Sequence, residues 1–241
     1  MTRVLITGGG SGTGADMARA FAAQGHEVVI TGRDIAKLEA VAGGLIRAVP
    51  GDVSDEDQVR RIFDDAGPCQ VVIANAGIAE AAPFARTTLD QFSRIMAVNL
   101  TGVFLTFRQA LSQMGPGGRL IAVSSAAGLR GAAYASAYAA SKHGVVGLVR
   151  SIALEVASKR ITANAICPSY LDTEMTGRTL DGIMAKTGRD RDAALAALTA
   201  RNPQGRLIAP AEVTGAALWL ASDAAAGVNG QAIVLDGGES A

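Results

Sequence analysis

The sequence predicts an α/β fold in which a central, mostly seven-stranded parallel sheet is covered by helices on both faces, a doubly wound arrangement. Three observations predict this fold. Short apolar runs alternate with amphipathic stretches along the chain, as in successive βαβ units. A glycine-rich segment directly follows the first apolar run. Polar residues follow the ends of several later runs, and parallel sheets bind ligands at that edge.

The composition is that of one domain over residues 1–241, without a linker, repeat or low-complexity segment. Lys+Arg and Asp+Glu balance at 22 each and aromatic residues make up only 4%, which argues against nucleic-acid binding. The distant Cys69 and Cys167 favour a reducing compartment, and no apolar run reaches membrane-spanning length. We therefore expect a cytoplasmic protein with no membrane partner.

The first βαβ unit predicts dinucleotide binding. Residues 4–6 (VLI) and 28–31 (VVIT) are short apolar runs, and residues 15–24 between them are amphipathic. The loop of residues 7–14 (TGGGSGTG) lets the backbone turn tightly and approach a pyrophosphate, which the helix N-terminus can bind. The glycine spacing differs from G-x-G-x-x-G. The prediction of nucleotide binding therefore rests on the position of the loop between a strand and a helix.

The residues after the second strand distinguish the two nicotinamide dinucleotides. An acidic residue there would accept hydrogen bonds from ribose hydroxyls and repel a 2′-phosphate. This chain has Arg33, which can pair with a phosphate, while Ser11 and Lys37 could add a hydroxyl and a charge. We expect NADP(H), with NAD(H) possible because Arg33 could instead pair with Asp34 or Glu39.

The third and fourth strands, residues 45–49 and 71–74, each end near polar residues. Asp52 could accept a hydrogen bond from an adenine amino group, or Asp52 or Ser54 could simply cap a helix at residues 55–65. The fourth strand ends in Asn75-Ala76-Gly77.

Residues 88–113 predict one long helix with a continuous apolar face that includes Leu89, Phe92 and Phe104. Asn99 lies within that apolar neighbourhood. Because a buried asparagine needs partners, it either tunes a site or ties two elements together.

The fifth strand, residues 119–123, and the helix of residues 138–156 predict a proton-transfer centre. Tyr138 and Lys142 lie four residues apart and therefore share one helix face. A nearby cation favours phenolate, so Lys142 should lower the pKa of Tyr138 from its usual value of about 10. Such a pair is common in ordinary helices. Ser125, at the carboxyl edge of the predicted sheet, makes a catalytic role for the pair the better interpretation.

The remaining part of the chain continues the alternation of strands and helices. His26 and His143 stand apart from any cluster, so we expect structural roles for them and no metal site. Pro210 is a helix start signal. The elements expected here are strands at residues 162–166 and 232–235 and helices at residues 191–200 and 212–221.

Taken in order, these residues resemble the short-chain dehydrogenase/reductase family over essentially the whole chain. The motifs that carry the resemblance are Thr7-Gly8-x-x-x-Gly12-x-Gly14, Asp52, Asn75-Ala76-Gly77, Asn99, Ser125, Tyr138-x-x-x-Lys142, Pro168 and Thr173. The chain has Thr13 where the family usually has Ile, and Ser169 where it usually has Gly. The resemblance implies a Rossmann-like domain that transfers a hydride between a nicotinamide and a ketone or secondary alcohol.

The resemblance also implies a role for each of these residues. Tyr138 would be the general acid or base, and Lys142 would lower its pKa and bind the nicotinamide ribose. Ser125, preferred to Ser124 for its interval to Tyr138, would bond the substrate oxygen, and Asn99 would hold a water that relays protons to Lys142. Residues lining the cofactor would be Thr7, Gly8, Ser11, Gly12, Thr13, Gly14, Arg33, Asp52, Val53, Asn75, Ala76, Gly77, Tyr138, Lys142, Pro168 and Thr173. Residues at the substrate would be Ser125, Tyr138, Tyr134 and Tyr170.

The charged segment of residues 170–206 resembles the lids of hydroxyacid or hydroxyacyl-thioester dehydrogenases, although most of its charges should be solvated. We expect a 3-oxoacyl or 3-hydroxyacyl substrate. The alternatives are an NAD-dependent dehydrogenase of a small hydroxy acid or cyclic alcohol, and a dinucleotide-sensing regulatory protein. Family members imply a homotetramer, or a dimer, formed through the helices around Asn99 and Tyr138 and the strand of residues 232–235.

Overall fold

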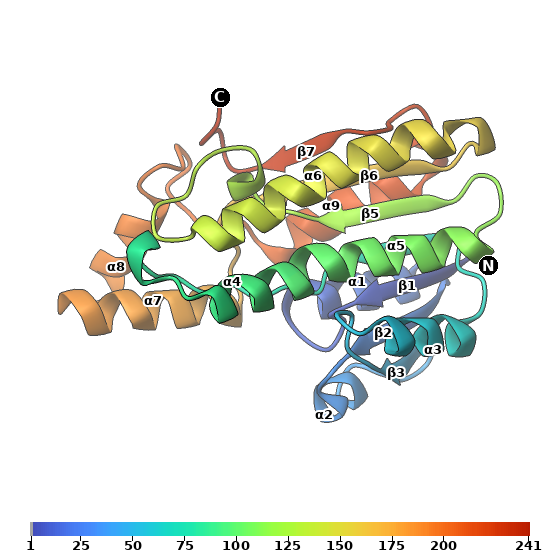
Figure 1. Cartoon of the computed structure of the whole chain (residues 1–241), viewed down its shortest axis with the longest axis horizontal. Helices are drawn as coiled ribbons and strands as arrows, with labels where there is room; N and C mark the ends of the chain where they lie inside the picture. Colours follow the sequence, from blue (N-terminus) through green and yellow to red (C-terminus); the bar gives the residue numbers. More distant parts are fainter. Residues whose placement is uncertain (1) are drawn as a thin grey trace.

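A computed structural model describes residues 2–241 (Figure 1). Seven strands form one sheet in the order β3-β2-β1-β4-β5-β6-β7, and every neighbouring pair is parallel. The predicted doubly wound parallel sheet is therefore confirmed. The strands are β1 (Arg3–Thr7), β2 (Glu27–Gly32), β3 (Ile46–Pro50), β4 (Val71–Ala74), β5 (Arg119–Val123), β6 (Thr162–Pro168) and β7 (Ala232–Leu235).

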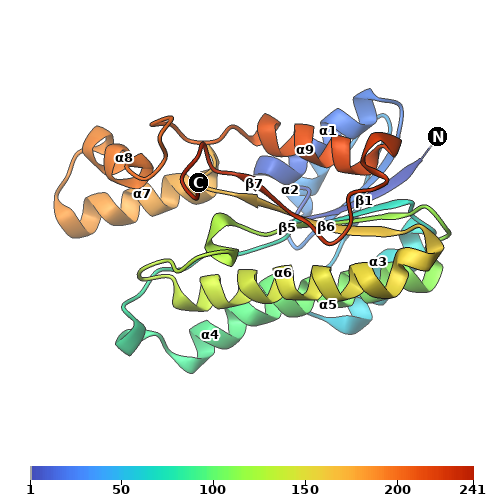
Figure 2. The same ribbon diagram turned by 90° about the horizontal axis from the view of Figure 1, so that it is seen from above.

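The helices cover both faces of the sheet (Figure 2). One layer contains α1 (Gly12–Ala23), α2 (Ile35–Glu39) and α9 (Pro210–Ala221). The other contains α3 (Glu56–Ala66), α4 (Leu89–Met96), α5 (Gly102–Gln113) and α6 (Ser136–Val156). The strand order reverses between β1 and β4, so the crevice beyond the carboxyl ends of these strands is the topological switch point where such sheets bind ligands.

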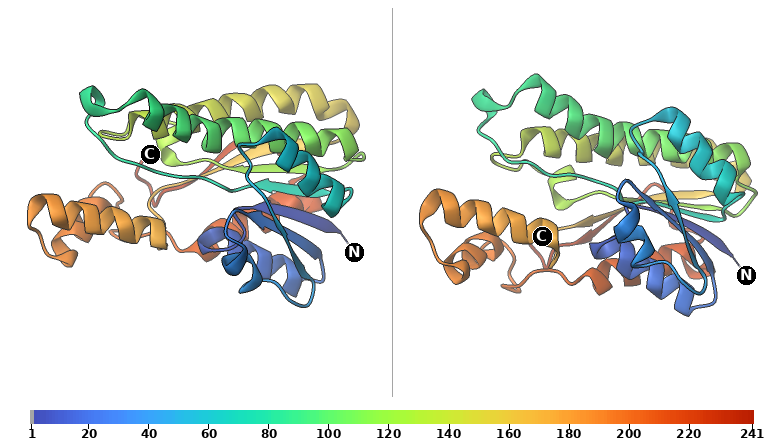
Figure 3. Two further views of the ribbon diagram at one scale, coloured as in Figure 1. Left: turned by 60° about the horizontal axis from the view of Figure 1, so that its bottom comes forward. Right: turned by 90° about the horizontal axis from the view of Figure 1, so that it is seen from below.

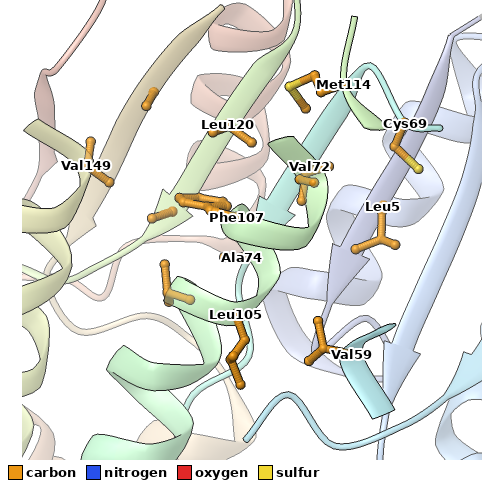
Figure 4. Packing of buried hydrophobic residues seen from close by; sticks show 14 of the residues in the cluster. Leu5, Val59, Cys69, Val72, Ala74, Leu105, Phe107, Met114, Leu120 and Val149 are labelled. Atoms are coloured by element: carbon orange, nitrogen blue, oxygen red, sulfur yellow. The ribbon is translucent and has the colours of Figure 1, made fainter. Parts of the chain in front are cut away.

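Alternate residues of each strand enter two separate hydrophobic cores. In β1, Leu5 packs with the layer of α3, α5 and α6, whereas Val4 and Ile6 pack with α1 and α9. Phe107 of α5 lies near Leu120 and Val72 in the first core (Figure 4). Burying one such large apolar side chain contributes about 1.5–3 kcal/mol. These cores hold the carboxyl edge of the sheet in place.

The helix predicted at residues 88–113 is present as a continuous helical run, but it includes one π-helical turn. This turn, Ala97–Thr101, separates α4 from α5. Leu89, Phe92 and Phe104, which the apolar pattern places on one helix face, are all exposed. The helix pair contacts the core only through a narrower stripe that includes Val103 and Phe107, so the rest of its apolar surface faces outward.

The segment after β6 forms two helices, α7 (Glu174–Thr187) and α8 (Arg191–Thr199). They pack on each other and project beyond the carboxyl edge of the sheet (Figure 3). The predicted helix at residues 191–200 is thus confirmed. Among the described helices, none has both the length and the apolar character needed to cross a membrane.

Candidate active site

The glycine loop between β1 and α1 forms a cradle that side chains would fill. Gly8 and Gly12 have φ angles of 67° and 50°, which glycine adopts most readily. A Cβ on Gly14 would lie 2.2 Å from the Gly8 carbonyl oxygen and 2.7 Å from the Asn75 amide nitrogen. The N-terminus of α1 points its free N–H groups into this loop, so the loop fits a dinucleotide pyrophosphate.

A hydrogen-bonded brace joins the ends of β1 and β4 beneath this loop. The Thr7 hydroxyl accepts from the backbone N–H groups of Asn75 and Ala76, each at 3.0 Å. The Asn75 amide donates to the carbonyl oxygens of Thr7 at 3.0 Å and Gly8 at 3.3 Å. Thr7 and Asn75 therefore hold the shape of the loop, whichever contacts they make with a cofactor.

A pocket of about 510 Å³ opens beside the glycine loop at the end of β2. The alternative in which Arg33 pairs with Asp34 or Glu39 is wrong: within residues 2–241, Arg33 forms no ion pair. Asp34 instead caps α2 by accepting from the Lys37 N–H at 3.2 Å. The lining residues are Gly8, Gly10, Ser11, Gly32, Arg33, Asp34, Lys37 and Leu38.

The third strand brings Asp52 to the same edge. Its carboxylate accepts from the Ser54 N–H at 2.9 Å and the Ser54 hydroxyl at 2.7 Å. Helix α3 is capped by Asp55, which accepts from the Gln58 N–H at 3.0 Å, so the alternative that Asp52 or Ser54 caps this helix is wrong. The buried Val53 packs against Gly102 at the start of α5.

Tyr138 and Lys142 lie on one face of α6, as their spacing predicts. The Lys142 ammonium nitrogen is 5.7 Å from the centre of the Tyr138 ring and donates to the Val123 carbonyl oxygen at 2.8 Å. Lys142 is only 4% exposed. Burial disfavours its charged form and lowers its pKa from 10.5 to about 8.

The expected lowering of the Tyr138 pKa by Lys142 is wrong for this structure. Burial raises the pKa of Tyr138, because the phenolate would lose its hydration, and the nearby Tyr170 phenol raises it further. A hydrogen bond with the Ser125 hydroxyl acts in the opposite direction and lowers it. Burial is the largest of these effects and decides the direction.

Of the two serines after β5, Ser125 is the one beside Tyr138. Its hydroxyl accepts from the Ala127 N–H at 3.1 Å and can donate to the Pro168 carbonyl oxygen at 3.4 Å. Ser124 is buried and donates to the Lys142 carbonyl oxygen at 3.0 Å, so it packs behind the site.

Asn99 is fully buried in the π-helical turn and ties two segments together. Its side-chain oxygen accepts from the Ile78 N–H at 2.8 Å, and its amide nitrogen donates to the Ile78 carbonyl oxygen at 2.9 Å and the Ser141 hydroxyl at 3.2 Å. A Cβ on Gly77 would lie 3.4 Å from the Asn99 oxygen and 3.6 Å from the Lys142 nitrogen. Both atoms therefore face the same small space.

The remaining predicted residues lie around the mouth of the site. Thr173 is the N-cap residue of α7, with its methyl carbon 3.6 Å from the position of a Cβ on Gly12, so the lid starts against the glycine loop. Tyr134 is exposed and has a φ of 63°, in the left-handed region. Tyr170 is close enough to Tyr138 for the two phenols to interact.

Two residues next to the site escaped the sequence prediction. Arg130 and Glu239 form an ion pair beside Tyr170, and Glu239 also accepts a hydrogen bond from Ser169 at 2.5 Å. The one signal in the sequence is Ser169 itself, which departs from the glycine usual in the resembled family.

Comparison with known proteins extends this picture. A family model described as enoyl-(acyl carrier protein) reductase matches residues 8–240. The chain belongs to the short-chain dehydrogenase/reductase family. The resemblance that the sequence motifs carried is thereby confirmed, and the chain is an oxidoreductase that uses a nicotinamide cofactor and acts on alcohol or keto groups of a small molecule.

Individual relatives in this family match the whole chain. The 3-oxoacyl-[acyl-carrier-protein] reductase MabA of Mycobacterium tuberculosis is 38% identical, over 98% of this chain and 91% of the relative. The cis-4-hydroxycyclohexanecarboxylate dehydrogenase of Sinomonas cyclohexanicum is 39% identical, over 98% and 96%. A crystal structure of an actinorhodin polyketide ketoreductase variant with NADPH superimposes with a TM-score of 0.92 at 31% identity, covering 99% of this chain and 97% of that one.

Proposed function

We propose that this enzyme interconverts a 3-oxoacyl compound and the corresponding 3-hydroxyacyl compound, with NADP(H) as its cofactor and Tyr138 as its acid and base. The observation that carries the proposal is the meeting of Ser125, Tyr138 and Lys142 at the carboxyl edge of the sheet, beside the glycine cradle. An intact set of this kind argues against a regulatory protein that only senses a dinucleotide.

The side chains divide the chemistry between them. When bound, the nicotinamide supplies or accepts the hydride. In reduction Tyr138 donates its phenolic proton to the carbonyl oxygen, and in oxidation it takes that proton back. Ser125 donates a hydrogen bond to the same oxygen and stabilises the charge that develops there. Lys142 would hold the nicotinamide ribose.

The space facing Gly77 supports the proton relay proposed for Asn99. The Asn99 oxygen and the Lys142 nitrogen both border this space, and a glycine leaves it open. A water held there would connect Lys142, whose pKa is about 8, to the surrounding backbone. Protons would then reach Lys142 without a conformational change.

The pocket at the end of β2 supports the choice of NADP(H). Arg33 is exposed, lines the pocket and can form a charge-assisted contact with a 2′-phosphate. Ser11 and Lys37 line the same pocket, although Lys37 also pairs with Glu174 at 3.4 Å. Asp34 in this lining favours a second candidate, an NAD(H)-dependent enzyme, because a carboxylate there can bind ribose hydroxyls.

The 3-oxoacyl substrate is supported by the MabA relative and the polyketide ketoreductase structure. Two further features fit an extended substrate: small residues precede Tyr138, and the α7–α8 lid stands apart from the sheet. The second candidate, dehydrogenation of a small hydroxy acid or cyclic alcohol, is favoured by the Sinomonas relative.

A substrate panel tests the proposal directly. The purified enzyme is supplied with 3-oxoacyl thioesters, simple ketones, hydroxy acids and cyclic alcohols, each with both cofactors, and turnover is followed by nicotinamide absorbance. We expect the highest kcat/KM for a 3-oxoacyl thioester with NADPH. Equal or higher kcat/KM with NADH, or a preference for a hydroxy acid, would select the second candidate instead.

A further inference from the structure

The residue after Pro168 departs from the family pattern, and the structure shows what it contacts. Ser169 has an ordinary negative φ angle, so no glycine is required by the backbone at this position. Its N–H donates to the Leu235 carbonyl oxygen at 3.0 Å, and its hydroxyl donates to Glu239 at 2.5 Å. Ser169 thus joins the end of β6 to the tail that follows β7.

Glu239 lies in the segment after β7, and its side chain is held inside the molecule. Its side chain is 4% exposed, and its second carboxylate oxygen pairs with the Arg130 guanidinium. In Figure 1 the tail ends beside the loop that precedes α6, where Arg130 lies. Burying a carboxylate is costly unless it is paired and hydrogen-bonded, and Glu239 has both kinds of partner.

The tail itself is built to bring Glu239 to this place. Gly237 and Gly238 have φ angles of 66° and 94°, so the chain turns sharply after β7. The Asp236 carboxylate accepts from the Gly238 N–H at 3.0 Å and from the Ser240 hydroxyl at 2.5 Å. Burial alone would raise the pKa of Asp236, but these hydrogen bonds lower it, so the carboxylate stays charged and the turn stays closed.

The two partners of Glu239 belong to two segments that meet at Ser125, the proposed catalytic serine. Ser169 follows Pro168, whose carbonyl oxygen faces the Ser125 hydroxyl at 3.4 Å. Arg130 lies in the loop that leads from Ser125 to α6. Glu239 therefore closes a ring of contacts around Ser125, and Tyr170, beside both Arg130 and Glu239, extends this ring to Tyr138.

We propose that Glu239 is a positioning residue for the reaction: its carboxylate, bound to Arg130 and Ser169, fixes the loop after β5 against the end of β6 and thereby sets the distance from Ser125 to Tyr138. The inference rests on the proposed roles of Ser125 and Tyr138. A displacement of a reacting group by about 1 Å can slow a reaction about a hundredfold. The tail is thus part of the site, although it touches no reacting atom.

Three variants distinguish a role of Glu239 in positioning Ser125 from a role in stabilising the fold alone. Glu239→Gln leaves the Arg130 charge without its partner, which should lower both the melting temperature and kcat, the latter by about tenfold or more. The double variant Arg130→Gln/Glu239→Gln removes both charges, so it should recover most of the melting temperature but not kcat. Ser169→Ala cuts the ring on its other side and tests the proposal even if Glu239→Gln does not fold.

The matched control is Glu27→Gln. It breaks another Arg–Glu pair, in which Arg3 and Glu27 approach to 2.9 Å at the amino end of the sheet. We expect this change to leave kcat and the cofactor Kd as in the wild type. The cofactor Kd should also stay within about twofold in the Glu239 variants, because the glycine cradle is untouched.

Two results would overturn the inference: an unchanged kcat in folded Glu239→Gln and Ser169→Ala, or a kcat that recovers together with stability in the double variant. Failure of the proposed function looks different. In that case Tyr138→Phe would keep its turnover, whatever the Glu239 variants do.

Discussion

At the scale of single residues, burial decides the chemistry of the Tyr138–Lys142 pair. The spacing of four residues correctly predicts that the two side chains share a helix face. It does not predict their pKa values, because these depend on how much water the surrounding elements exclude. Burial lowers the pKa of Lys142 and raises that of Tyr138, so each group is pushed toward its neutral form.

The first prediction concerns stability and pH. Lys142 has a pKa of about 8 in the folded protein and an ordinary value of 10.5, so between these pH values the unfolded chain holds a proton that the folded one lacks. The free energy of unfolding therefore rises with pH in this window. Relative to Lys142→Met, the wild type should gain about 2 kcal/mol between pH 7.5 and pH 10 in urea titrations. If the free energy of unfolding depended on pH in the same way in the wild type and in Lys142→Met, the lowered pKa of Lys142 in the folded protein would be contradicted.

At the scale of elements, the position of the glycine loop in the fold predicts a cofactor site better than the spacing of its glycines does. The loop departs from the general fingerprint, yet it lies between β1 and α1 and has the φ angles that its glycines permit. The close approach of Gly14 to the Gly8 carbonyl leaves no room for a side chain.

We expect Gly14→Ala to lower the stability of the apoprotein by about 1–3 kcal/mol, because the new Cβ collides with the backbone. NADPH binding, followed by fluorescence, should weaken at least about tenfold as the cradle opens. Gly182→Ala is the control, since a Cβ there has nothing within 4 Å. Equal NADPH affinity in Gly14→Ala and the wild type would show that the loop is not the cofactor cradle.

The end of β2 carries a prediction about cofactor choice. Arg33→Gln should raise the Kd for NADPH by about tenfold or more and leave that for NADH nearly unchanged, because only NADPH has the 2′-phosphate. Arg19→Gln removes an exposed charge of α1 outside this pocket and serves as the control. If Arg33→Gln raised the Kd for NADPH and for NADH by the same factor, Arg33 would not be the residue that binds the 2′-phosphate.

Sequence patterns missed features that depend on long-range contacts and one helix that is too short to show a period. The apolar spacing of residues 88–113 continues through the π-helical turn, so nothing local marks the turn that places Asn99. Helix α2 spans only 5 residues, which is too short to show a helical period. Glu239 meets Ser169 across 70 positions of the chain, and no spacing rule covers such a distance.

At the scale of the whole molecule, exposed apolar side chains on two separate surfaces support a proposed homotetramer. Phe104 lies on α5, and Leu89 and Phe92 lie on α4. Trp219 lies on α9 and Val234 on β7, a second surface. A tetramer with dihedral symmetry uses more than one kind of interface, and two such surfaces would provide it.

We expect Phe104→Glu and Trp219→Glu each to convert the tetramer to a dimer in light scattering, because each places a charge in a different apolar interface. Leu45→Glu, before the edge strand β3, changes an exposed apolar residue outside both surfaces and should leave the mass unchanged. A wild type that is monomeric at all concentrations, or variants with unchanged mass, would rule out this assembly.

The central claim is that Tyr138 transfers the proton, and Tyr138→Phe tests it most directly, because the change removes one hydroxyl and keeps the ring. Acid–base catalysis of this kind contributes about a hundredfold to ten-thousandfold, so kcat should fall by at least that lower factor. The NADPH Kd and the melting temperature should stay close to the wild-type values. Turnover that persists at the wild-type rate in Tyr138→Phe would contradict the account.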